Sequence, residues 1–470
     1  MSFLERNANS GSVSTGYDID NSIKLEVNNN EWLYRNSPTA GNRKTFTLSL
    51  WLKRAALGHK PAGDDEYLAG QGSSARFHFA GDTLRFMFAG NSTELESSRV
   101  YRDASAWYHI VLAVDTTQGT NTNRVKLYIN GVQESWNNSD WPGQNTESDW
   151  MNTNDLYIGT KWGNNSTGDG DNDLSGYLSE VVLLDGTAAS PTSFGEFDDN
   201  GIWKPVDVSG LTFGSEGFYA NFDDSSALGA DSSGNGNTLS LSNIAAADQA
   251  TDTPTNNFCT WSPLWAEPRA NGTITEGATQ VAWGGSAWKI ARSSMAVSKG
   301  RWYWEIKAAN VTGDTWNNNL FGFASVEGDN GQYGPMVLLG YSTGNYYYRV
   351  ANSQTGSDDW GDAGGAWSSS DTFGLALDLE SSTKKFILYR NGSAVNGSGT
   401  NLVSAFQTEQ FFTTYSTAYN GDTQFLNWGG YTVNTISSAA SDANGYGTFE
   451  YAPPTGYYSL CSKNLSEFGG

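Results

Sequence analysis

Short segments in which apolar and polar residues alternate recur along almost the whole chain, and they limit the fold more than any other feature. In the clearest example, TFTLSLWLK at residues 45–53, every second residue is Phe or Leu. This period of two places the apolar residues on one face of a β-strand. Similar strands are predicted at residues 22–27, 76–79, 84–88, 107–115, 125–131, 155–159, 177–185, 299–307, 320–325, 373–380 and 385–392. No long segment has helical periodicity, so an all-β fold of antiparallel sandwiches is expected.

Composition supports the strands and limits the partners. The 470 residues include 13% aromatic residues and 18 Trp, and large aromatic side chains can build cores in a chain that is only 38% hydrophobic. The formal net charge of −23 argues against a nucleic-acid partner and against an anionic membrane surface. The sequence has no apolar run of about 18 residues and no apolar signal core at its start, so no membrane insertion is expected.

A turn-rich stretch, residues 217–261, divides the chain into two halves of similar texture. Its small polar run SSGNGN at 232–237 suits tight turns, and Pro254 ends regular structure. The predicted organisation is an N-terminal arm at 1–20, a first sandwich at 21–205, a connecting segment at 206–262 and a second sandwich at 263–470. The two cysteines, Cys259 and Cys461, flank the second sandwich; they form either a bridge or two unpaired thiols.

The first half resembles the laminin G-like, concanavalin A-like jelly roll. The matching segments are FTLSLWLK at 46–53, WYHIVLAVD at 107–115, VKLYING at 125–131 and LSGYLSEVVLLDG at 174–186. The second half resembles the SPRY domain, through KGRWYWEIK at 299–307, LFGFAS at 320–325, FGLALDLE at 373–380 and KFILYRNG at 385–392. The first resemblance implies a fold that hosts lectins, glycosidases and spacers, and the second implies protein binding through loops.

Other segments resemble virion proteins of tailed phages, particularly marine ones. They are NRKTFT at 42–47, DSSGNGN at 231–237, DTPTNNF at 252–258 and PPTGYYSLCSKNL at 453–465. The resemblance implies a non-enzymatic protein on the virion surface, either for host adhesion or for capsid decoration. Its expected partners are other virion proteins and a host-surface glycan or protein. A homo-oligomer is also expected, because avidity multiplies weak contacts, and we expect a trimer.

Two aromatic and acidic sets are candidates for sugar binding. The first is Trp141, Trp150 and Trp162, and the second is Trp360, Asp362 and Trp367, near a run of three tyrosines at 346–348. Sugars stack on exposed aromatic rings and hydrogen-bond to Asp and Asn. Since Trp is highly buried on average, the alternative is that these residues belong to the cores.

A calcium site is the only cofactor considered, in the acidic segment DGDND at 169–173. Asp169, Asp171 and Asp173 have the spacing of carboxylates in a calcium loop. Leu174 stands where an EF-hand requires Gly, so a looser loop-edge site or a solvated acidic loop remains.

Catalytic residues are hard to find. Glycosidases of this fold need paired carboxylates on one strand, and the nearest string, ESDWMN at 147–152, lacks the second Glu. His59, His78 and His109 are scattered without an evident acid or nucleophile, so structural roles are expected. A glycan-degrading enzyme and a purely structural connector stay as the alternatives.

Overall fold

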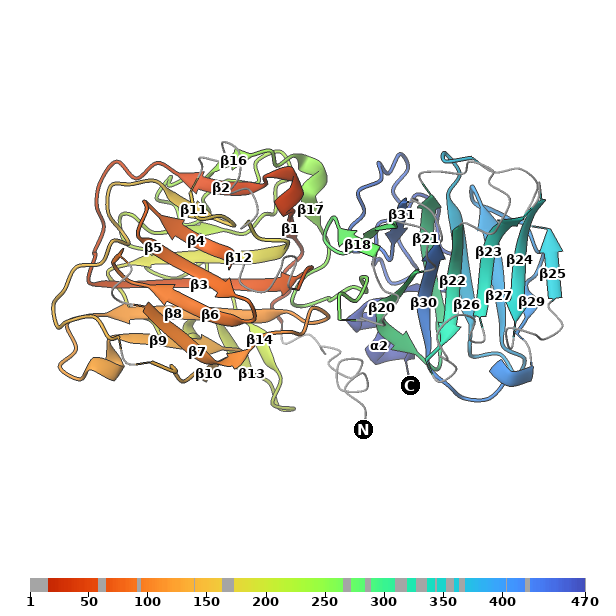
Figure 1. The fold of residues 1–470 in the computed structure, drawn as a ribbon, viewed down its shortest axis with the longest axis horizontal. Helices are drawn as coiled ribbons and strands as arrows, with labels where there is room; N and C mark the ends of the chain where they lie inside the picture. Colours follow the sequence, from red (N-terminus) through yellow and green to blue (C-terminus); the bar gives the residue numbers. More distant parts are fainter. Residues whose placement is uncertain are drawn as a thin grey trace. The chain divides into compact units, whose positions relative to one another are not determined.

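The structure, a computed structural model, describes residues 16–57, 65–90, 94–138, 140–162, 173–264, 272–283, 289–308, 319–326, 336–342, 345–351, 359–362, 368–402, 404–418 and 423–469. Two compact units are present, which we call the first domain (Ser14–Thr255) and the second domain (from Asn256 to Gly470). Each is built around two large β-sheets (Figure 1).

The first domain consists of an eight-stranded and a seven-stranded sheet, in which every strand pairing is antiparallel. The order in the eight-stranded sheet is β10-β9-β8-β3-β12-β1-β17, and β15 pairs with β12. Its strands are β1 (Ser22–Leu25), β3 (Thr45–Arg54), β8 (Tyr108–Asp115), β9 (Val125–Ile129), β10 (Val132–Gln133), β12 (Gly176–Asp185), β15 (Phe218–Ala220) and β17 (Gln249–Ala250).

The seven-stranded sheet has the order β16-β2-β11-β4-β5-β6-β7. Its strands are β2 (Trp32–Arg35), β4 (Asp65–Gln71), β5 (Ala75–Ala80), β6 (Thr83–Met87), β7 (Glu94–Val100), β11 (Leu156–Ile158) and β16 (Ser240–Ser242). Short 3-10 helices are η1 (Val27–Asn29), η3 (Asn121–Asn123), η4 (Pro191–Ser193) and η5 (Ala246–Asp248).

The core between the two sheets follows from the alternation. Phe46, Leu48, Leu50 and Leu52 of β3 are all at most 2% exposed and belong to this core, as the period of two predicts. Turns of the Asn-Gly type join the strands: Asn130 and Gly131 have φ values of 49° and 78° between β9 and β10. Such left-handed pairs match the twist of a hairpin, which is why this dipeptide marks the turn.

The other face of the eight-stranded sheet is also covered. The hairpin of β13 (Gly195–Phe197) and β14 (Trp203–Pro205) lies against it, and His109 stacks between Trp51 and Trp203 with ring-centroid distances of 4.5 and 5.9 Å. The indole N–H of Trp203 donates to Nδ1 of His109 at 2.9 Å, and Nε2 lies 2.9 Å from Oγ of Ser49. Burial lowers the pKa of His109 to about 3, so the ring is neutral and structural, as expected from the sequence.

The expected connecting segment is instead part of the first domain. Strands β15, β16 and β17 lie within residues 206–262 and pair with β12, β2 and β1. Asp252 is 1% exposed and binds the ammonium of Lys53 at 2.6 Å and the indole N–H of Trp107 at 3.0 Å. The division between the domains therefore falls at Thr255 and Asn256. The three strands have only two or three residues each, too few to show an alternating pattern among turn residues.

The second domain has a nine-stranded sheet in the order β18-β19-β31-β21-β26-β27-β28, with β29 paired to β27 and β32 to β21. Its strands are β18 (Gly272–Thr275), β19 (Gln280–Trp283), β21 (Arg301–Ala308), β26 (Phe373–Asp378), β27 (Lys385–Arg390), β28 (Ser393–Ala394), β29 (Thr400–Asn401), β31 (Thr423–Asn427) and β32 (Tyr458–Ser459). Only β32 runs parallel to its neighbour among the pairings described in this sheet.

The second sheet of this domain has six strands in the order β20-β30-β22-β23-β24-β25. They are β20 (Lys289–Val297), β22 (Asn319–Ser325), β23 (Met336–Ser342), β24 (Asn345–Ala351), β25 (Asp359–Asp362) and β30 (Phe412–Ala418), and the 3-10 helix η6 (Ser404–Phe406) and the helix α2 (Ser462–Phe468) complete the domain. The prediction of an all-β chain made of antiparallel sandwiches is confirmed.

The ends of the second domain lie together. Phe258 and Cys461 form an isolated antiparallel β-bridge through their backbones. The backbone N–H of Cys259 donates to the carbonyl of Leu460 at 3.0 Å. Both cysteines are nevertheless buried thiols that form no disulfide, and burial raises the pKa of Cys461 to about 12. Within the described part of the chain, no helix has the length and apolar character needed to cross a bilayer.

The last five residues of the predicted N-terminal arm are part of the first domain. Residues 1–15 lie outside the described residues, but residues 16–20 belong to the first domain. Ile19 is 4% exposed and its backbone N–H donates to Oγ1 of Thr255 at 3.0 Å. The hydroxyl of Tyr17 donates to the carboxylate of Glu180.

Candidate functional site

The hairpin of β5 and β6 carries polar side chains on the face of the seven-stranded sheet that points away from the core. Phe77 and Phe79 are fully buried in the core, so the residues that alternate with them, Arg76 and His78, lie on the opposite face. The pairing over Gly81, which has a φ of 61°, places His78 opposite Arg85.

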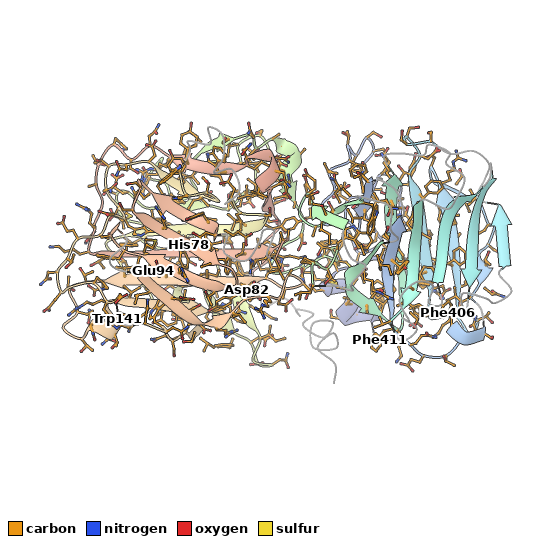
Figure 2. All side chains as sticks on the ribbon, viewed as in Figure 1. His78, Asp82, Glu94, Trp141, Phe406 and Phe411 are labelled. Atoms are coloured by element: carbon orange, nitrogen blue, oxygen red, sulfur yellow. The ribbon has the colours of Figure 1, made fainter. Side chains whose placement is uncertain are left out.

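The same register continues across four strands. His78 is opposite Tyr67 of β4, and Arg85 is opposite Glu96 of β7, so the four side chains form one row on the outer face. The ring centroids of Tyr67 and His78 are 4.9 Å apart. His78 and Glu94, which begins β7, are labelled in Figure 2.

The chain that follows β11 crosses this face at a glycine. A Cβ atom on Gly70 of β4 would lie 2.3 Å from the backbone carbonyl oxygen of Lys161, so only glycine allows the crossing. The crossing brings the Lys161 ammonium 3.9 Å from the ring centroid of Trp162 and 5.7 Å from that of Tyr67. The guanidinium carbon of Arg76 lies 5.8 Å from the Trp162 ring. Cations at these distances over aromatic faces are favourable contacts.

We call this group the outer-face cluster; it comprises Tyr67, Arg76, His78, Arg85, Lys161 and Trp162. His78 is 2% exposed, and its pKa is lowered to about 4 by burial first and then by the positive charges of Arg85, Arg76 and Lys161, against the opposing effect of Asp65. The histidine is therefore neutral at pH 7. Arg76, Lys161 and Trp162 are half-buried.

Hydrogen bonding in the cluster is incomplete among the described residues. Nε of Arg76, Nδ1 of His78 and Nε of Arg85 are buried and have no hydrogen-bond partner there. Buried polar atoms normally have partners, so three such atoms on two adjacent strands distinguish this face. The charge of Arg85 is balanced by Glu94 and Glu96, each 3.3 Å away.

The structure separates the three Trp candidates of the first domain. Trp150 is a core residue, contrary to its assignment as a ligand-binding residue: it is 2% exposed, stacks on Phe86 at 5.8 Å and donates its indole N–H to the Met87 carbonyl at 2.9 Å. Trp141 is partly buried and packs against the same core (Figure 2). Trp162 alone of the three lies in the outer-face cluster.

Two candidates of the second domain, Trp360 and Asp362, lie in an edge strand of the six-stranded sheet. Residues 359–362 form β25, whose backbone places Trp360 opposite Arg349 and Asp362 opposite Tyr347 of β24. Trp367 lies outside the described residues. The sequence of β25, DWGD, shows no strand pattern. The strand is defined by its pairing with β24.

The predicted calcium segment is only partly described. Asp169 and Asp171 lie outside the described residues, and Asp173 is 5% exposed at the end of that segment. Glu180 lies in β12 and accepts a hydrogen bond from Tyr219. No group of metal-binding side chains is present among the residues that the structure describes, and the calcium site stays a prediction.

The carboxylates of the glycosidase alternative are engaged with an arginine. Glu147 and Asp149 lie 3.1 and 3.7 Å from the guanidinium of Arg43. His59 lies outside the described residues.

Most of the cluster was not singled out from the sequence. Arg76 and Arg85 alternate with Phe residues in two predicted strands, so the pattern contained the information that they share a face with His78 once the strands pair. Lys161 had no such signal, because it reaches the face through a crossing at Gly70.

Comparison with known proteins agrees with the fold of the first domain. Residues 9–192 match the family model of the concanavalin A-like lectin/glucanases superfamily, of the laminin G type; this is less than half of the chain. The first domain is thus a concanavalin A-like, laminin G-type sandwich. A search of curated proteins gave no match.

Solved structures with some similarity include both expected fold types. Domains LG4-5 of the mouse laminin alpha1 chain are 11% identical, with coverage of 93% of this chain and 89% of that one and a TM-score of 0.29. The SPRY domain of human HERC1 is 15% identical over 33% of this chain and 91% of its own, with a TM-score of 0.25. The carbohydrate recognition domain of Emp46p in its potassium-bound form is 9% identical over 36% and 87%, with a TM-score of 0.27.

Proposed function

We propose that the chain is a non-enzymatic binding protein on the surface of a tailed-phage particle, and that its first domain binds a glycan of the host surface. The observation that carries the glycan proposal is Trp162, half-buried between Lys161 and Arg76 on the outer face of a sandwich whose family model describes lectins and glucanases. An aromatic face with polar groups beside it suits a sugar ring.

The particle location is supported by sequence alone. The segments at 42–47, 231–237, 252–258 and 453–465 resemble those of tailed-phage virion proteins. Host adhesion and capsid decoration both fit a surface location, with other virion proteins as partners. We propose a homo-oligomer, a trimer, because it gives avidity.

The experiment measures binding of the full chain to host-envelope polysaccharides immobilised on a sensor. Trp162→Ala is expected to weaken binding at least tenfold, which corresponds to about 1.4 kcal/mol. Trp141→Ala is the matched control, since it removes a partly buried indole outside the cluster and should leave affinity unchanged.

Three other outcomes contradict the proposal in different ways. Shortened polysaccharide chains after incubation would favour the glycan-degrading enzyme. Equal losses in both variants would show that the outer-face cluster is not the binding site. Absence of binding to any host glycan would favour a structural connector of the virion.

A further inference from the structure

We propose that the outer-face cluster selects an acidic saccharide, and that Arg76 and Lys161 bind a carboxylate or sulfate group on a sugar ring that lies beside Trp162. The inference rests on the proposed glycan-binding function and adds the chemical class of the ligand.

The distribution of charge is the first argument. The chain has 27 Lys and Arg residues against 50 Asp and Glu, yet three of these cations gather around one histidine on a single sheet face. Their like charges repel one another, and a bound anion would reduce that repulsion. The net charge of −23 does not prevent an anion from binding there, because fields between exposed charges are screened beyond about 8 Å at physiological salt.

The cations differ in how far their charge is already balanced. Arg85 lies between Glu94 and Glu96, each at 3.3 Å. Arg76 instead donates from Nη2 to the carbonyl oxygen of Ser73 at 2.9 Å, which satisfies one donor but does not balance the charge. Its Nε atom has no hydrogen-bond partner within the described part of the chain. Arg76 is therefore the cation best placed to bind an incoming oxyanion, and its planar guanidinium fits a carboxylate with two hydrogen bonds.

The buried histidine below is the second, independent observation. His78 is 2% exposed, and its Nδ1 atom has no partner among the described residues. Its Nε2 atom is 3.7 Å from Asp65, which is longer than a hydrogen bond. A buried ring nitrogen without a partner is unfavourable, and a ligand oxygen or a ligand-held water can satisfy it.

The aromatic side chains favour a sugar over other anions. Two cations lie near the Trp162 ring, Lys161 at 3.9 Å and Arg76 at 5.8 Å from its centroid. Groups that can bind an acidic substituent therefore lie beside an aromatic ring that can contact a sugar. A nucleic acid would need many more phosphate contacts than these few cations supply.

The test uses the full chain and three soluble polymers measured by isothermal titration calorimetry: polygalacturonate, dextran sulfate and neutral dextran. Arg76→Gln and Lys161→Gln should each weaken binding of an acidic polymer at least tenfold. Arg102→Gln is the matched control, because Arg102 is 61% exposed, pairs with Asp82 and lies outside the cluster. Equal thermal unfolding of the three variants confirms that each is folded. Preference for polygalacturonate identifies a carboxylate ligand, and preference for dextran sulfate a sulfate ligand.

Two results overturn the inference. One is the absence of binding to both acidic polymers, and the other is an equal loss of binding in Arg102→Gln. If neutral host glycans still bind and that binding requires Trp162, the proposed function stands and only the acidic preference fails. If no saccharide binds at all, the proposed function fails as well.

Discussion

At the scale of single residues, a carboxyl group buried in β12 makes the stability of the first domain depend on pH. Glu180 is 5% exposed, adopts a φ of 50° at a break in the register between β12 and β3, and accepts hydrogen bonds from the hydroxyl of Tyr219 at 2.7 and 2.8 Å. Burial raises its pKa to about 7, although Tyr219 and Tyr17 act in the opposite direction.

The sign of the effect follows from the raised pKa. Below pH 4.5, Glu180 is protonated in both the folded and the unfolded state, and the stabilisation is complete; it is lost as the pH rises towards 7. Glu180→Gln removes the ionisation, so at pH 8 it should be more stable than the natural chain by up to about 3 kcal/mol. The difference should approach zero near pH 4.5. Urea unfolding of both proteins at the two pH values measures it, and a difference that is independent of pH would contradict the account.

Tryptophan shows how far a single residue can be interpreted from sequence. Trp150 and Trp162 have similar polar neighbours, but Trp150 is in the core and Trp162 beside two cations. The distinction depends on partners distant in the chain, Phe86 for Trp150 and Arg76 for Trp162. Local composition contains no such information.

At the scale of elements, the segment that was expected to connect two domains completes the first one. Asp252 follows β17 and binds Lys53 of β3, and both side chains are 1% exposed. An ion pair as deeply buried as this one is strongly destabilising to break, because the remaining charge is left without a partner.

Asp252→Asn should therefore destabilise the first domain by about 3–5 kcal/mol, although its amide can still bind the indole of Trp107. Thermal unfolding followed by calorimetry measures the loss. The double variant Asp252→Asn with Lys53→Met should recover much of it, since the unpaired ammonium is gone. A double variant no more stable than the single one would refute the assigned role of the pair.

The long strands were predictable and the short ones were not. Residues 45–53 alternate over nine residues and appear in β3, and residues 177–185, which contain the apolar run VVLL, appear in β12. By contrast, β15, β16 and β17 contain three, three and two residues, and their place follows from pairing with distant strands. The Asn-Gly turns were predictable because their backbone geometry is local.

At the scale of the whole molecule, the start of the chain divides into two parts with different expected roles. Residues 16–20 belong to the first domain. For residues 1–15 we propose the role of an arm that attaches the protein to the particle. Deletion of residues 1–15 should leave thermal unfolding of the purified protein unchanged and release it from particles. Deletion of residues 1–20 should also lower the unfolding temperature, because Ile19 is 4% exposed and binds Thr255. Retention of the shorter deletion on particles would refute the arm.

Gold labelling of the second domain on intact particles, viewed by electron microscopy, separates the two surface roles. Label on the tail favours host adhesion, and label over the head favours capsid decoration. Particles without label would contradict the virion proposal.

The central claim is that the first domain binds a saccharide on the outer face of its seven-stranded sheet. The most direct measurement is a crystal structure of the full chain grown with the saccharide that binds most tightly. The account predicts a sugar ring beside Trp162, with its acidic group within hydrogen-bond distance of Arg76 or Lys161. A sugar bound elsewhere, on the second domain or at Trp141, would contradict it.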